Sequence, residues 1–79
     1  MMTKREAWMT SNAHGVTWDN LKQYRLLHDI GHFMGDRHPK GTVVWGYPYA
    51  NDRDYLEIIT PDKFALTVAE GMDVELVSD

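Results

Sequence analysis

The chain has 79 residues, of which 43% are hydrophobic and 25% are charged, and its formal net charge is −4. This composition excludes a disordered chain, and the length predicts one domain over residues 1–79 with a small core. The acidic balance argues against direct binding to nucleic acid, and the absence of cysteine excludes disulfides and thiolate metal sites.

The chain contains no apolar run of about 18 residues, so we expect no contact with a membrane. Its first residues, 1–6, lead into no apolar stretch of the kind found in signal peptides. No cofactor-binding motif is present, so we expect no cofactor. These features together predict a cytoplasmic protein.

The first predicted element is a short helix over residues 3–13. Thr3 and Glu6 have the spacing of a capping box, and Gly15 lies where such a helix would end.

The main predicted element is a helix that begins after Thr17 and ends at Gly35. At about 100° per residue, its apolar side chains form one broad face and its charged side chains form the other. Gly31 inside this helix would allow another backbone to approach closely. The apolar face consists of Leu21, Tyr24, Leu26, Leu27, Ile30, Phe33 and Met34.

The segment 26–32 reads LLHDIGH and resembles the metal-binding signature of HD-domain phosphohydrolases, in which an adjacent His-Asp pair binds a divalent metal. On a helix, His28, His32 and Asp36 would share one exposed stripe, and imidazole and carboxylate groups suit a transition metal. The resemblance implies a metal-dependent hydrolase or metal-binding protein that uses His28, Asp29 and His32. The family also needs an earlier His and a later Asp on neighbouring helices, which a strand-rich second half does not offer. Metal chemistry is therefore the alternative hypothesis.

After residue 41 the hydrophobic period changes from 3.6 to 2, which predicts strands. A three-residue loop at 69–71 would pair Val68 with Met72 and Leu66 with Val74, and it would place Gly71 where φ is positive. A short helix over residues 61–70 is the alternative for this segment. The predicted strands span residues 42–49, 55–60, 64–68 and 72–76.

These elements predict an α+β fold, with one main helix packed on a small antiparallel sheet of three or four strands and a short N-terminal helix. In the first hairpin, Tyr49 would pair with Tyr55, Tyr47 with Glu57 and Trp45 with Ile59. The sheet face beneath the helix would then carry the core residues Val44, Leu56, Ile58, Phe64, Leu66 and Val68.

The other sheet face would expose an aromatic stripe, and aromatic side chains with polar tips are favoured anchors of protein interfaces. The alternative is that Trp45 and Tyr47 belong to the core, with the faces inverted or with Trp8 or Trp18 covering the stripe. The predicted partner-binding residues are Trp45, Tyr47, Tyr49, Asp52, Asp54, Tyr55 and Glu57.

These observations predict a non-enzymatic protein-binding module whose partner is a larger protein or complex. By analogy of size and charge, small inhibitors from phages and mobile elements, anti-CRISPR proteins among them, are the expected class. In such an inhibitor the acidic side chains, with Asp73 and Glu75 among them, would imitate phosphates toward a basic nucleic-acid-binding surface. A homo-oligomeric structural or assembly component, joined through the stripe or a sheet edge, is the other alternative.

Overall fold

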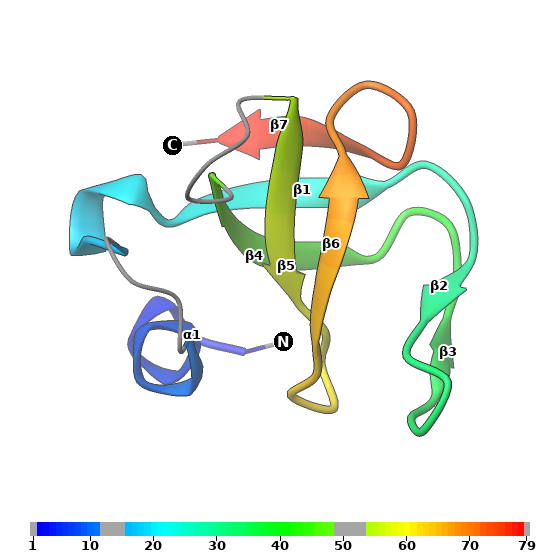
Figure 1. The fold of residues 1–79 in the computed structure, drawn as a ribbon, viewed down its shortest axis with the longest axis horizontal. Helices are drawn as coiled ribbons and strands as arrows, with labels where there is room; N and C mark the ends of the chain where they lie inside the picture. The colour runs from blue at the N-terminus through cyan, green and yellow to red at the C-terminus, as the bar shows by residue number, and fades with distance from the viewer. Residues whose placement is uncertain (1, 12–15, 49–53, 79) are drawn as a thin grey trace.

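The computed structural model describes residues 2–11, 16–48 and 54–78. Within these ranges the chain forms one short α-helix, one 3₁₀ turn and seven strands (Figure 1). In chain order these are α1 (Lys4–Thr10), η1 (Trp18–Asn20), β1 (Lys22–Leu26), β2 (Ile30–Gly31), β3 (Arg37–His38), β4 (Val43–Pro48), β5 (Tyr55–Ile59), β6 (Ala65–Ala69) and β7 (Val74–Ser78).

Five of the strands form one antiparallel sheet in the order β6-β5-β4-β1-β7, and β2 pairs with β3 in a separate small hairpin. The last strand therefore lies beside the first, since β1 pairs with both β4 and β7. In Figure 1 the strands β1 and β7 run across β5 and β6. The sheet is strongly twisted and folds over its own inner face, which encloses the core.

The inner face of the sheet carries the main core, and this confirms the predicted core role of Val44, Leu56, Ile58 and Val68. Gly46 lies on the same face as Val44. A Cβ atom there would stand 3.0 Å from the Tyr24 ring and 3.1 Å from Ile58, so glycine makes room for the ring. The buried members of the cluster are Tyr24, Leu26, Val44, Leu56, Ile58, Val68 and Val74.

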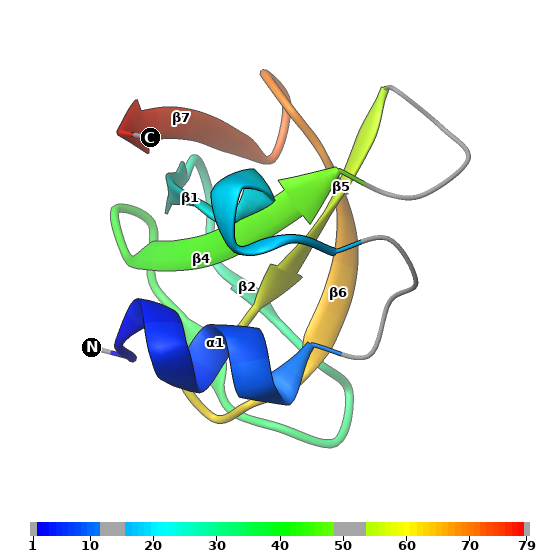
Figure 2. The same cartoon turned by 90° about the vertical axis from the view of Figure 1, so that its left-hand side faces the viewer.

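The outer face of β4 and β5 is covered by α1 (Figure 2). The helix begins with the predicted capping box: the Glu6 N–H donates to Thr3 Oγ1, and the Thr3 N–H donates to the Glu6 carboxylate. Ala7 then packs in a second buried cluster with Tyr47 and Ile59. None of the helical residues in the described ranges forms a segment with the length and hydropathy of a membrane span.

The predicted main helix over residues 17–35 is wrong, and so is the α+β fold class that depends on it. Tyr24 and Leu26 are buried while Arg25 between them is exposed, which is the period of a strand. The apolar residues of this segment fit both the helical period of 3.6 and the strand period of 2. The segment forms a strand because it pairs with two strands that are distant in the sequence, β4 and β7. Thr17 is a cap as predicted, but of the short turn η1, where Oγ1 accepts from the Asn20 N–H.

The first hairpin has the predicted register, with Trp45 opposite Ile59 and Tyr47 opposite Glu57. The expected pairing of Tyr49 lies outside the described residues. Residues 65–69 form the predicted strand rather than the alternative helix, and Gly71 has the predicted positive φ, 91°.

The predicted pairing of the last two strands is wrong. Val68 lies opposite Leu56 and Leu66 opposite Ile58, so β6 pairs with β5 rather than with β7. The strand β7 pairs instead with β1, because the turn after β6 leads the chain to the opposite edge of the sheet, beside β1. Alternation along the sequence defines the face of a strand, but it does not define its neighbour.

Candidate functional site

The segment that resembles the HD signature is not helical, and its three candidate ligands point to three different partners. His28 Nε2 lies 2.7 Å from Asp73 Oδ1, and Asp29 Oδ1 accepts from the Lys40 N–H at 2.8 Å. The His32 ring stacks on Phe64 with a centroid distance of 4.4 Å. Across the residues that the structure describes, no group of three or more His, Asp or Glu side chains is arranged to hold a metal.

The His28 ring connects the end of β1 to the turn between β6 and β7. Both of its nitrogens face oxygen acceptors: Nε2 faces the Asp73 carboxylate, and Nδ1 lies 3.2 Å from the Asp29 carbonyl. The Asp73 carboxylate and the Asp29 carbonyl therefore raise the pKa of His28. Hydrogen bonds from the Ala69 N–H and from His28 lower the pKa of Asp73.

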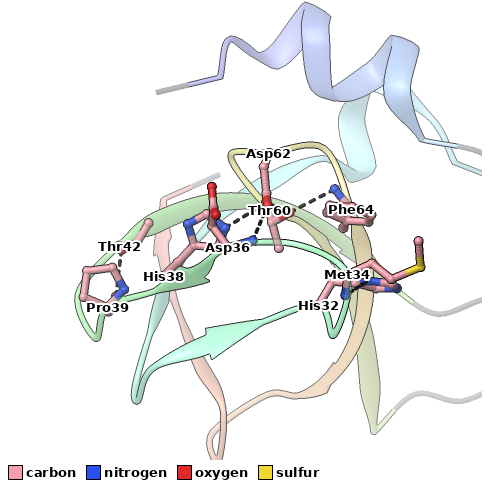
Figure 3. Close-up of polar contacts among 9 residues, drawn as sticks. All are labelled: His32, Met34, Asp36, His38, Pro39, Thr42, Thr60, Asp62 and Phe64. Atoms are coloured by element: carbon pink, nitrogen blue, oxygen red, sulfur yellow. Dashed lines mark hydrogen bonds and ion pairs between the residues drawn. The ribbon is translucent and has the colours of Figure 1, made fainter.

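The segment between β1 and β4 forms a loop that carries β2 and β3, and His28 lies at its first end. A second His-Asp pair lies near its other end, between β3 and the turn after β5 (Figure 3). Asp62 Oδ1 accepts from His38 Nε2 at 2.8 Å and from the Thr60 hydroxyl at 2.7 Å, and Oδ2 accepts from the Asp36 N–H at 2.7 Å. These donors hold the pKa of Asp62 well below its usual range.

The hydrogen bonds of this second network also extend into the turn after β5. The Thr60 side chain is buried, and its hydroxyl also accepts from the Phe64 N–H, so it is held within the turn. The two His-Asp pairs therefore fix both ends of the loop that carries β2 and β3 against the sheet.

Two members of the predicted aromatic stripe lie beneath α1. Tyr47 is 1% exposed, and Trp45 is half-buried and donates its indole N–H to the Met2 carbonyl. The Tyr47 hydroxyl is buried and has no hydrogen-bond partner among the described residues. Burial, with the charge of Glu57 nearby, raises the pKa of Tyr47 to about 12. Tyr47 thus belongs to a buried cluster and Trp45 packs against it, which is close to the core role that the alternative interpretation gave them.

The remaining predicted residues divide into three groups. Tyr55 and Asp54 are exposed at the start of β5, and Glu57 is half-buried on the outer face of the same strand. Tyr49 and Asp52 lie outside the described residues. The exposed pair is therefore the part of the predicted set that the structure leaves accessible.

Tyr55 and Asp54 line a groove between the β1–β7 side and the β5–β6 side of the sheet, which we call the seam groove. It consists of two adjoining hollows that share Glu70. The first has a volume of about 390 Å³ and is lined by Asn20, Lys22, Tyr24, Pro48, Leu56, Glu70 and Leu76. The second has a volume of about 530 Å³ and is lined by Asp54, Tyr55, Ala69, Glu70, Gly71 and Met72.

Large apolar side chains are exposed along this groove. Tyr55 is 44% exposed, Met72 77% and Leu76 46%. Glu70 is also exposed, and within the described ranges its carboxylate has no hydrogen-bond or ion-pair partner. The groove therefore combines apolar contact area with an available negative charge.

The exposed groove residues Glu70, Met72 and Leu76 are among those that were not predicted as site residues. The alternation of residues 72–76 placed Met72 and Leu76 with Val74 on a core face, but only Val74 is buried. Met72 lies in the turn, where alternation does not apply. The sequence did contain one signal for this exposure. Met72 directly follows Gly71, a residue typical of turns, and side chains in turns are usually exposed.

A second exposed apolar pair lies elsewhere. Phe33 is 90% exposed and Met34 71%, in the turn between β2 and β3. Figure 1 shows this turn at the opposite end of the molecule from the turn between β6 and β7. The pair offers apolar area, but neither hollow of the seam groove includes it.

Comparison of the chain with protein-family models, with curated proteins and with solved structures finds no match.

Proposed function

We propose that this chain is a non-enzymatic protein-binding module that binds its partner through the seam groove. The observation that carries the proposal is the exposure of Tyr55, Met72 and Leu76 around two adjoining hollows. Exposed apolar side chains that gather at one concave place are typical of an interaction surface. Buried tyrosine is among the residues that contribute most to binding energy, and methionine adapts its shape to a partner.

The walls of the groove are held in place before any partner arrives. The Leu27 N–H donates to the Asp73 carbonyl at 2.8 Å, and the Ala69 N–H donates to the Asp73 carboxylate at 2.9 Å. With His28, these contacts fix the turn that carries Glu70 and Met72. A preformed surface loses less conformational entropy on binding, which favours affinity.

The charge of the groove favours a basic partner surface. Asp54 and Glu70 line the second hollow, and the whole chain has a net charge of −4. The finer part of the proposal is a small inhibitor, of the phage or mobile-element class, that covers a basic surface of a host protein or defence complex. A cytoplasmic setting fits a chain that has no cysteine.

Self-association is a second candidate, because β6 and β7 are the outer strands of the five-stranded sheet. An outer strand presents unpaired backbone groups that can pair with another chain. Val77 on β7 is 39% exposed, which adds apolar area near that edge. Sedimentation equilibrium over a wide concentration range separates this candidate from binding to a different protein.

Affinity capture with matched variants tests the proposed function. The native chain, Tyr55→Ala/Met72→Ala and Phe33→Ala/Met34→Ala serve as baits, after circular dichroism shows that all three are folded. Each double variant removes one exposed aromatic residue and one exposed methionine, from opposite ends of the molecule. We expect one protein to be retained by the native chain and by the Phe33/Met34 variant and lost from the Tyr55/Met72 variant. Loss from the Phe33/Met34 variant alone would move the binding surface to the β2–β3 turn.

A further inference from the structure

We infer that the seam groove accepts an arginine side chain from an extended segment of the partner, with the guanidinium beside Glu70. This inference rests on the proposed function, and it names the chemistry that the groove recognises.

The charge of the second hollow is the first argument. Two carboxylates line this hollow, Asp54 and Glu70, and no cation of the described residues lines it. Glu70 stands at the boundary of both hollows, and within the described ranges its carboxylate has no partner. A carboxylate in that state can accept two parallel hydrogen bonds from a guanidinium, which an ammonium group cannot supply in the same geometry.

The apolar walls of the same hollow are the second argument. Tyr55 and Met72 are both exposed and line the hollow together with Glu70. The aliphatic stem of an arginine can lie along such side chains while its charged end reaches the carboxylate. The Tyr55 ring adds a face on which a planar guanidinium can stack. A purely apolar ligand would leave the Glu70 carboxylate without a partner among the described residues.

The first hollow indicates what lies next to the arginine along the partner segment. Tyr24, Leu56 and Leu76 line it, and so does Lys22, which among the described residues is the cation in the lining of the two hollows. A second cationic side chain would be placed near Lys22, which is unfavourable. We therefore expect an apolar side chain in the first hollow and the arginine in the second.

The test is a titration of the full chain by ¹H–¹⁵N NMR with N-acetyl-arginine amide. The uncharged isostere N-acetyl-citrulline amide is the control ligand, and Glu70→Gln is the control variant. The Glu70 side chain is exposed, and within the described ranges its carboxylate has no hydrogen-bond or ion-pair partner, so we expect the substitution to leave the fold intact. We expect saturating shifts at the amides of Tyr55, Glu70 and Met72, at least threefold weaker binding of citrulline, and about fivefold weaker binding of arginine to Glu70→Gln.

Equal shifts with the two ligands, equal affinity in the variant, or arginine shifts elsewhere on the chain would overturn the inference. Its failure can be separated from failure of the proposed function by using Glu70→Gln as a bait in the capture experiment. If the partner binds this variant as it binds the native chain but is lost from Tyr55→Ala/Met72→Ala, the groove binds a protein without recognising arginine. Loss of the partner from both variants supports the inference.

Discussion

His28 Nε2 lies 2.7 Å from Asp73 Oδ1, although the two residues are 45 positions apart in the sequence. The contact is possible because β7 lies beside β1, so the turn before β7 comes next to the segment after β1. That turn carries Glu70 and Met72. A surface ion pair of this kind adds little to global stability, but it holds one wall of the seam groove in position.

The first prediction concerns the titration of His28. Because its partners raise its pKa above 6.5, protonation of His28 stabilises the folded state. This stabilisation is fully present below the unfolded pKa and is lost as the pH rises through the folded pKa. We expect an NMR titration to give a midpoint above 6.5 for His28 in the native chain and a lower midpoint in Asp73→Asn. Equal midpoints in the two proteins would show that the pair does not form in solution.

The second prediction concerns acid stability and Asp62. Its pKa is depressed below 3.8, so its ionised form stabilises the fold above that value, and the stabilisation is lost as the pH falls toward the folded pKa. We expect Asp62→Asn to be less stable than the native chain at neutral pH, and the difference to shrink from about pH 5 to about pH 2. Urea unfolding at several pH values measures this difference. A constant difference across the series would contradict the assignment.

The third prediction concerns the close contact at Gly46. A Cβ atom at this position would press on the Tyr24 ring and on Ile58 inside the core. We expect Gly46→Ala to lower the free energy of unfolding by about 1–3 kcal/mol. In a Tyr24→Leu background the same substitution should cost less, because the ring is gone. The double-mutant cycle is measured by chemical denaturation, and equal costs in both backgrounds would rule out this contact as the cause.

The fourth prediction concerns the buried Tyr47 hydroxyl, which has no hydrogen-bond partner among the described residues. Removing an unsatisfied buried polar atom while keeping the ring should stabilise the protein. We expect Tyr47→Phe to raise the free energy of unfolding by about 1 kcal/mol and Tyr47→Ala to lower it by about 3–5 kcal/mol. Thermal and urea unfolding of the two variants check this. A loss of stability in Tyr47→Phe would mean that the hydroxyl is hydrogen-bonded in solution.

Local features of the fold were predictable from the sequence where local chemistry decides the structure. The capping box of Thr3 and Glu6, the register of Tyr47 with Glu57 and the positive φ of Gly71 each depend on a few neighbouring residues. The core face of the first hairpin was also predictable, because Val44, Leu56 and Ile58 share one face of the sheet.

Long-range pairing was not predictable in the same way. The segment 22–26 forms a strand because it pairs with β4 on one side and with β7 on the other. The residues of the segment itself do not indicate that it has two neighbouring strands. The His28–Asp73 pair and the seam groove are consequences of that pairing. Met72 and Leu76 were not predicted as site residues for this reason. Tyr55 was predicted as part of the aromatic stripe and Asp54 as an acidic side chain, and both are exposed.

The most direct measurement is the dissociation constant of the captured partner for the native chain and for Tyr55→Ala/Met72→Ala, by isothermal titration calorimetry. If the seam groove is the interface, the double variant should bind at least about thirtyfold more weakly, since buried tyrosine anchors contribute about 2 kcal/mol or more. The matched Phe33→Ala/Met34→Ala variant should bind like the native chain. An unchanged dissociation constant for the Tyr55/Met72 variant would contradict the assignment of the groove as the binding surface.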